Sequence, residues 1–236
     1  MPVLLALDSA TESLALALAA DDRLYLREED GGAQSSARIV PLLYELLAEA
    51  GLALADVDAL AFGRGPGAFT GLRTACAVTQ GLAFGANKPV VPVDSLLVVA
   101  EDARAQAAAA GTPLASPIWV AMDARMNEIY AAQYCWDGAR WQTLAEPALY
   151  APEALRARWG QPQAAAGNAL DVFAPVLGDA SQSWPKQQSR AAALSRLALL
   201  GWVGGARLDA AEAQPIYVRD KVALTTAERL AAGGVR

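Results

Sequence analysis

The chain has 236 residues, of which 54% are hydrophobic, and 19 Lys and Arg stand against 25 Asp and Glu, for a net charge of −6. This length and composition are typical of one large or two small globular domains and exclude a disordered chain. The net negative charge argues against independent binding of nucleic acid, which needs a basic surface. The chain has no histidine, which excludes Ser-His-Asp or Cys-His catalysis and any His-containing zinc site.

The apolar pattern of the N-terminal half predicts three strands followed by alternating helices and strands. Residues 4–7, 13–20 and 24–28 are apolar runs separated by polar turns, as in a three-stranded meander. Next we expect a helix at 36–50 that ends at Gly51, a strand at 57–62, a helix at 70–86, a strand at 89–93 and a helix at 95–110.

A glycine and two prolines interrupt the pattern at residues 111–117, and we place a domain boundary there, between 1–111 and 112–236. The second domain is the smaller one, and its final helix is expected to pack back on the first. Its expected elements are strands at 119–123 and 129–134, a strand or loop at 141–149, a short helix at 152–159, a strand end at 164–167, a helix at 189–201 and a terminal segment at 216–219.

The opening pattern of the chain recurs after this boundary. Residues 119–123 resemble residues 4–8, because each run is apolar and ends in an aspartate. Glu12 and Glu128 then precede a second apolar strand in each half. This echo predicts a strand-turn-strand unit that is duplicated in two related subdomains.

The segment 63–73 is rich in glycine, with four glycines and one proline between an apolar strand and an apolar helix. Glycine allows close approach of the backbone, and a helix N-terminus presents free N–H groups that suit a phosphate. The same glycines also fit a tight connection without a ligand. The segment matches neither the Rossmann glycine pattern nor the P-loop.

Three features bear on location. The sequence has no run of about 18 apolar residues, so we expect no membrane span. Met1-Pro2-Val3 leads straight into a strand-like run, which is unlike a secretory signal. Cys76 and Cys135 lie in apolar runs and are expected to be buried small residues. We therefore expect a cytoplasmic protein.

The first two long helices are more apolar than a single core contact requires. Apolar residues of the helix 36–50 span about 200°, whereas one core-facing stripe needs about 100°. Between 70 and 86 the only charged residue is Arg73. Either these helices are buried on two sides in their own domain, or they form an interface with another subunit. The interface residues would be Ile39, Val40, Leu43, Tyr44, Leu47, Gly71, Ala75, Val78 and Leu82.

Four segments, 8–12, 63–73, 122–130 and 215–219, resemble the bacterial TsaB (YeaZ) family, in order over essentially the whole chain. The resemblance implies an α/β fold of the actin-like, heat-shock-ATPase-like (ribonuclease H-like) type, with two related subdomains and mixed sheets. It also implies a part in the synthesis of threonylcarbamoyladenosine beside the anticodon of tRNAs that read codons starting with A.

The resemblance further implies partners. In this family the paralogue TsaD performs the transfer, from an adenylate made by TsaC, and the small ATPase TsaE is a further partner. This chain would be a non-catalytic scaffold that binds TsaD through its first two long helices. The same surface can give homodimers when the chain is alone, and the sequence leaves open whether the free chain is a monomer or a homodimer. It would reach tRNA only through the complex and require no cofactor itself, although ATP or ADP could bind at the junction with TsaD.

The superfamily's phosphate-binding pattern is incomplete here. Asp8 and Thr11 keep their places in the Asp-x-Gly-Thr-type turn, but Ala10 replaces its glycine, the second phosphate loop retains only Gly167, and the metal-binding histidines of TsaD-like proteins are absent. Ser35 stands where many TsaB sequences have histidine. We expect no catalytic or metal-binding residue and a degenerate nucleotide site formed by Asp8, Thr11, Gly63, Arg64, Gly65 and Gly67.

Two other functions stay open. Asp8, Thr11 and the glycine segment also fit a stand-alone actin-like ATPase or small-molecule kinase, which would hydrolyse nucleotide without a partner. A glycoprotease-type peptidase is an old label for the superfamily, but without histidine the chain lacks a metal site or triad for that chemistry.

Overall fold

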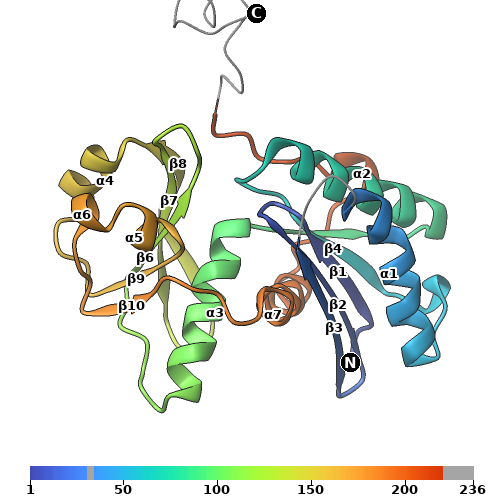
Figure 1. Ribbon diagram of the computed structural model, residues 1–236. Coiled ribbons are helices and arrows are strands. Elements are labelled where there is room, and N and C mark those ends of the chain that lie inside the picture. Colours follow the sequence, from blue (N-terminus) through green and yellow to red (C-terminus); the bar gives the residue numbers. More distant parts are fainter. Residues whose placement is uncertain (31–34, 220–236) are drawn as a thin grey trace, which may run out of the picture.

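Two five-stranded mixed sheets organise the chain in a computed structural model that describes residues 1–30 and 35–219 (Figure 1). In the first sheet the order is β3-β2-β1-β4-β5, and in the second it is β10-β9-β6-β7-β8. The strands of the first sheet are β1 Leu4–Asp8, β2 Ser13–Ala20, β3 Arg23–Asp30, β4 Ala59–Gly63 and β5 Val90–Val93. Those of the second are β6 Ile118–Asp123, β7 Ile129–Trp136, β8 Trp141–Tyr150, β9 Ala164–Ala166 and β10 Gln182–Trp184.

The two sheets have the same connectivity. In each, three consecutive strands form an antiparallel meander, a fourth strand pairs in parallel with the first strand of that meander, and a fifth pairs in parallel with the fourth. Asp8 and Asp123 therefore end equivalent strands. This confirms the predicted duplication and the two-subdomain, actin-like α/β fold. We call the first sheet with its helices the first lobe, and the second sheet with its helices the second lobe.

Helices cover both faces of each sheet. The helices are α1 Ser35–Ala50, α2 Phe69–Ala86, α3 Ser95–Ala109, α4 Pro152–Trp159, α5 Ala169–Val172, α6 Ala174–Leu177 and α7 Arg190–Val203, with 3-10 turns η1 Leu54–Asp56 and η2 Ala210–Glu212. Figure 1 shows α1 and α2 on the outer face of the first sheet, α4 to α6 on the outer face of the second, and α3 and α7 between the sheets.

The core of the first lobe follows from the alternation of side chains along a strand. Leu5 and Leu7 of β1 join a cluster with α1 and α2, whereas Leu4 and Ala6 join the cluster around α7 on the other face. Because both faces are covered, β1 is buried throughout and its sequence is a continuous apolar run. Small side chains on the inner face admit α7 closely: Ala6, Ala15, Ala17, Ala59 and Ala61.

The structure refines several expectations. β4 begins at Ala59 rather than at residue 57, because η1 precedes it, and residues 141–150 form a strand, β8. The short elements α5, α6 and β10 were not predicted. Cys76 is buried, but Cys135 is partly exposed, so the expectation of burial is wrong for Cys135.

The described part of the second expected domain, 112–236, does not all pack around the second sheet. Its last long helix, α7, packs against β1, β2 and β5 of the first lobe. The side chain of Ser35 lies outside the described residues, as does the chain after Arg219. Within residues 1–30 and 35–219, no helix has both the length and the hydrophobicity that a membrane crossing requires.

Candidate functional site

Asp8 lies at the carboxyl end of β1, and protein groups satisfy its buried carboxylate. Its Oδ2 accepts hydrogen bonds from Nη2 of Arg190 at 2.8 Å and from Oγ of Ser95 at 3.0 Å. Its Oδ1 accepts from the backbone N–H of Ala10 at 2.6 Å. The side chains of Arg190 and Asp8 are 3% and 0% exposed. Asp8 is thus held by an internal ion pair, shielded from solvent.

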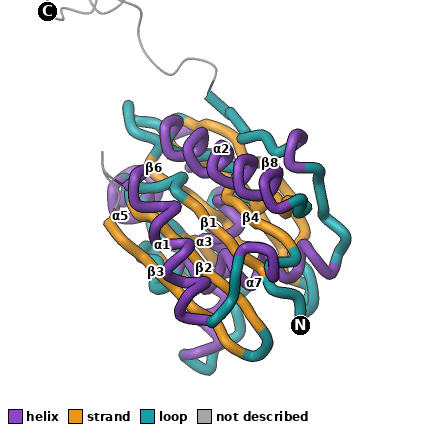
Figure 2. Tube along the Cα trace, turned by 90° about the vertical axis from the view of Figure 1, so that its right-hand side faces the viewer, coloured by secondary structure: helices purple, strands orange, loops and turns teal. Residues whose placement is uncertain are grey.

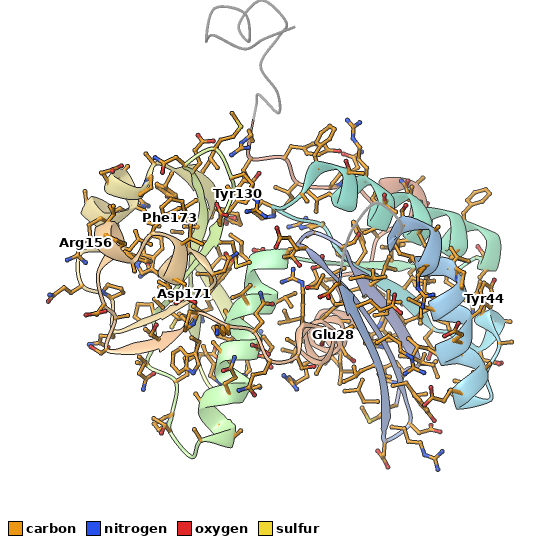
Figure 3. All side chains as sticks on the ribbon, in the orientation of Figure 1. Glu28, Tyr44, Tyr130, Arg156, Asp171 and Phe173 are labelled. Carbon is orange, nitrogen blue, oxygen red and sulfur yellow. The ribbon has the colours of Figure 1, made fainter. Side chains whose placement is uncertain are left out.

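Arg190 reaches Asp8 because the start of α7 is fixed from the first sheet. Glu28 of β3 accepts hydrogen bonds from Oγ of Ser189 at 3.0 Å and from the backbone N–H of Ala191 at 2.9 Å. Figure 3 shows Glu28 beside α7. The anchored first turn of the helix then directs Arg190 toward the end of β1, where it also donates to the backbone oxygen of Ser95 at 3.3 Å.

The glycines at the end of β4 and in the following loop are required by contacts within the protein. A Cβ on Gly63 would overlap the carboxylate of Asp8, and one on Gly67 would overlap the backbone oxygen of Ala10. The backbone N–H of Ala68 donates to that same oxygen at 2.7 Å. The glycine loop therefore packs directly on the turn between β1 and β2, as in a tight connection without a ligand.

The predicted degenerate nucleotide residues do come together, but their polar groups are hydrogen-bonded to neighbouring groups of the protein. Oγ1 of Thr11 pairs with Oγ of Ser13 at 3.2 Å. The N–H of Gly65 donates to Oγ of Ser95 at 3.0 Å, and the N–H of Arg64 donates to Val93 at 2.8 Å. These residues do not fit a metal-bound phosphate at Asp8, since a guanidinium already neutralises its carboxylate and the loop backbone covers the turn.

A cavity of about 1030 Å³ lies between the lobes, next to this turn. Its wall includes the β1–β2 turn, the glycine loop, the β6–β7 hairpin and the segment Ile216–Arg219. Tyr130 of β7 faces the first lobe here (Figure 3). Ser95, Arg190 and Arg219 also line it. Sequence reasoning missed Ser95 and Arg190, because no local motif signals a partner that lies far away in the chain, whereas Arg219 lies in the family-like segment 215–219 but was given no role.

A second buried contact joins the lobes at the start of α3. Asp94 caps this helix by accepting from the N–H of Leu96 at 2.8 Å, and it accepts from the hydroxyl of Tyr134 on β7 at 2.5 Å. Burial raises the pKa of Asp94, although these hydrogen bonds oppose the change. Burial, and then the charge of Asp94, raises the pKa of Tyr134 well above its ordinary value.

The predicted interface residues of α1 separate into two faces. Ile39, Leu43 and Leu47 are at most 2% exposed and pack in the core of the first lobe. Their assignment to an interface was wrong. One side of the wide apolar arc packs in the core of the first lobe, and only the other side is exposed to solvent. Val40 and Tyr44 are 37% and 48% exposed, and Tyr44 points outward (Figure 3).

The predicted residues of α2 separate in the same way. Ala75 is fully buried, and a Cβ on Gly71 would overlap the backbone oxygen of Ser9, so neither position directs a side chain toward a partner. Val78 and Leu82 are half-buried at the edge of the core. Phe84, which was not predicted, is 81% exposed.

The exposed residues of the two helices form what we call the helix surface. Figure 2 shows α1 and α2 in front of the first sheet, facing away from the second lobe. The helix surface consists of Val40 and Tyr44 of α1 together with Ala77, Gly81, Phe84 and Gly85 of α2. A group of exposed aromatic and small apolar residues on two neighbouring helices is typical of a protein–protein contact.

Comparisons with known proteins relate the chain to TsaD over much of its length and to TsaB (YeaZ) proteins over nearly all of it. A family model described as TsaD, tRNA N6-adenosine threonylcarbamoyltransferase, matches residues 29–200. The tRNA threonylcarbamoyladenosine biosynthesis protein TsaB of Escherichia coli K12 is 31% identical over 235 residues, which cover 93% of this chain and 96% of that protein. TsaB of Haemophilus influenzae is 39% identical over 158 residues, a match that spans 64% of each chain.

Two solved structures from Pseudomonas aeruginosa are also similar. YeaZ is 32% identical with a TM-score of 0.79, and the match covers 92% of this chain and 100% of that one. A protein described as similar to peptidase YeaZ is 34% identical with a TM-score of 0.82, and the match covers 93% and 100% of the two chains.

Proposed function

The chain belongs to the bacterial TsaB (YeaZ) family, whose members are named for tRNA threonylcarbamoyladenosine biosynthesis, and on this premise we propose that it is the non-catalytic partner of the transferase TsaD. It binds TsaD directly, works with TsaE in the assembled complex and depends on TsaC for the threonylcarbamoyl adenylate. It meets tRNA only through the complex. Any ATP or ADP binds at the junction with TsaD, and the free chain pairs with itself.

The ion pair between Asp8 and Arg190 carries the non-catalytic part of the proposal. In active actin-like proteins the equivalent aspartate serves a metal-bound phosphate, and it must be free to do so. Here Arg190 lies 2.8 Å from Asp8, and both side chains are buried. A metal ion would have to displace a buried guanidinium and leave that charge unpaired, at a cost of about 3–5 kcal/mol.

The helix surface supports the partner role. Phe84 is 81% exposed and Tyr44 is 48% exposed, on neighbouring helices that otherwise pack well on their own sheet. Aromatic side chains of this kind are often the residues that contribute most of the binding free energy at an interface. We assign this surface to TsaD, and to a second copy of the chain when TsaD is absent.

A reconstitution from which one component is omitted tests the function. TsaC, TsaD, TsaE, ATP, threonine, bicarbonate and tRNA are combined with and without this chain, and threonylcarbamoyladenosine in the tRNA is quantified. We expect product only when the chain is present, and none from the chain without TsaD. Equal product in its absence would overturn the partner role and make nucleotide hydrolysis by the isolated chain the next function to test.

A further inference from the structure

The segment 213–219 leaves the first lobe and ends against the second (Figure 1). Its residues Ile216–Arg219 line the cavity between the lobes. It begins on α2, where the backbone oxygen of Ala213 accepts hydrogen bonds from Nε2 of Gln80 at 2.9 Å and from Sγ of Cys76 at 3.2 Å. The backbone N–H of Ile216 then donates to the oxygen of Arg64 at 2.6 Å.

Tyr217 adds a side-chain anchor on the first lobe. Its ring lies 5.3 Å from the ring of Phe69, and its hydroxyl accepts a hydrogen bond from Nε of Arg73 at 3.1 Å. The guanidinium of Arg73 also lies 3.8 Å from the centre of the Phe69 ring. The segment is therefore held along α2 and the glycine loop by backbone, aromatic and cation–π contacts.

Arg219 anchors the other end of the segment on the second lobe. Its Nη2 donates to the backbone oxygen of Ala124 at 2.9 Å and to Oε2 of Glu128 at 2.6 Å. Its guanidinium lies 5.8 Å from the centre of the Tyr130 ring. The Arg219 side chain is only 12% exposed, so these charge-assisted bonds are better shielded from solvent than a surface ion pair.

The receiving hairpin has a defined shape. Arg125, Met126 and Asn127 all have left-handed backbone conformations, with φ between 56° and 63°. The N–H of Ala124 donates to the oxygen of Glu128 at 2.9 Å, which closes the turn. Arg125 also pairs with Glu12 of the first lobe, but these side chains are 68% and 82% exposed, and such pairs contribute little.

We propose that residues 213–219 are a strap that holds the two lobes at their present separation, and that Arg219 is the contact that must release before the cavity can open. The lobes also meet deeper down, where α3 contacts α7 and Tyr134 contacts Asp94. Those buried contacts form the base about which the lobes can hinge, and the strap closes the opposite side. The proposal does not depend on the identity of any partner.

Interlobe distance measured by pulsed electron spin resonance tests the strap. Nitroxide labels are placed at Glu45 of α1 and Glu153 of α4, which are both exposed, and the labelled chain is diluted with unlabelled chain so that pairing of two copies contributes no distance. The background carries Cys76→Ser, which keeps a donor for Ala213, and Cys135→Ala. We expect Arg219→Ala to broaden the distance distribution toward longer distances by several ångströms, as for a hinge opening of two domains.

Arg207→Ala is the matched control, because Arg207 is exposed and stacks on Trp202 within the first lobe, with its guanidinium 3.7 Å from the ring centre. We expect this variant to keep the parent distribution. Glu128→Gln removes the partner carboxylate and should reproduce the effect of Arg219→Ala. Identical distributions for the parent, Arg219→Ala and Glu128→Gln would overturn the proposal.

Discussion

The guanidinium of Arg190 lies 2.8 Å from the carboxylate of Asp8, although the two residues are 182 positions apart in the sequence. The pair fixes the start of α7 to the end of β1, and so joins the last long helix to the first strand. A buried pair of this kind need not stabilise the fold on balance, because each ion loses its hydration. Breaking one side of it, however, leaves a buried charge without a partner.

Replacing Arg190 alone should therefore destabilise the chain more than replacing both partners. We expect Arg190→Met to lower the free energy of unfolding by about 3–5 kcal/mol. The double variant Asp8→Asn/Arg190→Met should recover most of that loss, because no buried charge remains. Urea unfolding of the two single variants and the double variant measures the coupling. Losses that simply add would show that the two side chains do not interact.

Gly63 and Gly81 should respond in opposite directions to the same substitution. A Cβ on Gly63 would overlap the carboxylate of Asp8, so we expect Gly63→Ala to destabilise the fold by several kcal/mol through steric overlap in a packed site. Apart from its chain neighbours and the nearby backbone of its own helix, no atom of the described residues lies within 4 Å of a Cβ on Gly81, an exposed helical position. Gly81→Ala should raise stability by up to about 1 kcal/mol.

Thermal and urea unfolding of both variants checks this pair. Equal effects would mean that Gly63 is not in contact with Asp8, and that both positions report only the helix or strand propensity of alanine.

The duplicated strands could be predicted because local patterns carry them. An apolar run that ends in aspartate, followed by a turn and a second apolar run, occurs twice, and the two sheets have the same connectivity. The partner of Asp8 could not be predicted, because Arg190 has no local signal and reaches its position only after α7 folds back.

The sequence also could not predict which residues of α1 face the core and which face solvent. A wide apolar arc shows that a helix has more apolar surface than one contact needs, but not which side meets the sheet. Leu43 and Tyr44 are neighbours in the sequence, yet one is 1% and the other 48% exposed. Only the packing of the helix on its own sheet decides between them.

Alkaline pH should destabilise the chain through Tyr134. Burial and the charge of Asp94 raise the pKa of its hydroxyl well above the ordinary tyrosine value of about 10 in the folded state. The native state therefore keeps a proton that the unfolded chain loses, so this stabilisation is complete below about pH 10 and declines as the pH rises further. The expected slope from this group is up to about 1.4 kcal/mol per pH unit.

Urea unfolding between pH 8 and 11 measures the slope. Tyr134→Phe should be less stable at neutral pH, because Asp94 loses a donor, but its stability should decline less steeply above pH 10. Tyr44→Phe, at an exposed position on α1, should follow the parent. Parallel alkaline slopes for the parent and Tyr134→Phe would refute the assignment.

The helix surface should bind TsaD through its most exposed aromatic residue. Phe84→Arg places a charge where the proposed contact would remove it from water, and an unpaired charge in an interface costs several kcal/mol. Phe84 is 81% exposed, so the variant should fold like the parent. We expect loss of the complex with TsaD in gel filtration, and a loss of product in the reconstituted reaction.

Leu144→Arg is the matched control for this prediction. Leu144 is a 54% exposed apolar residue on β8, in the second lobe and away from α1 and α2. The same introduced charge there should leave the complex intact. Val78 and Leu82 are poorer test positions, because both pack against the core and an arginine would also disturb the fold. Normal complex formation by a folded Phe84→Arg variant would move the TsaD contact off the helix surface.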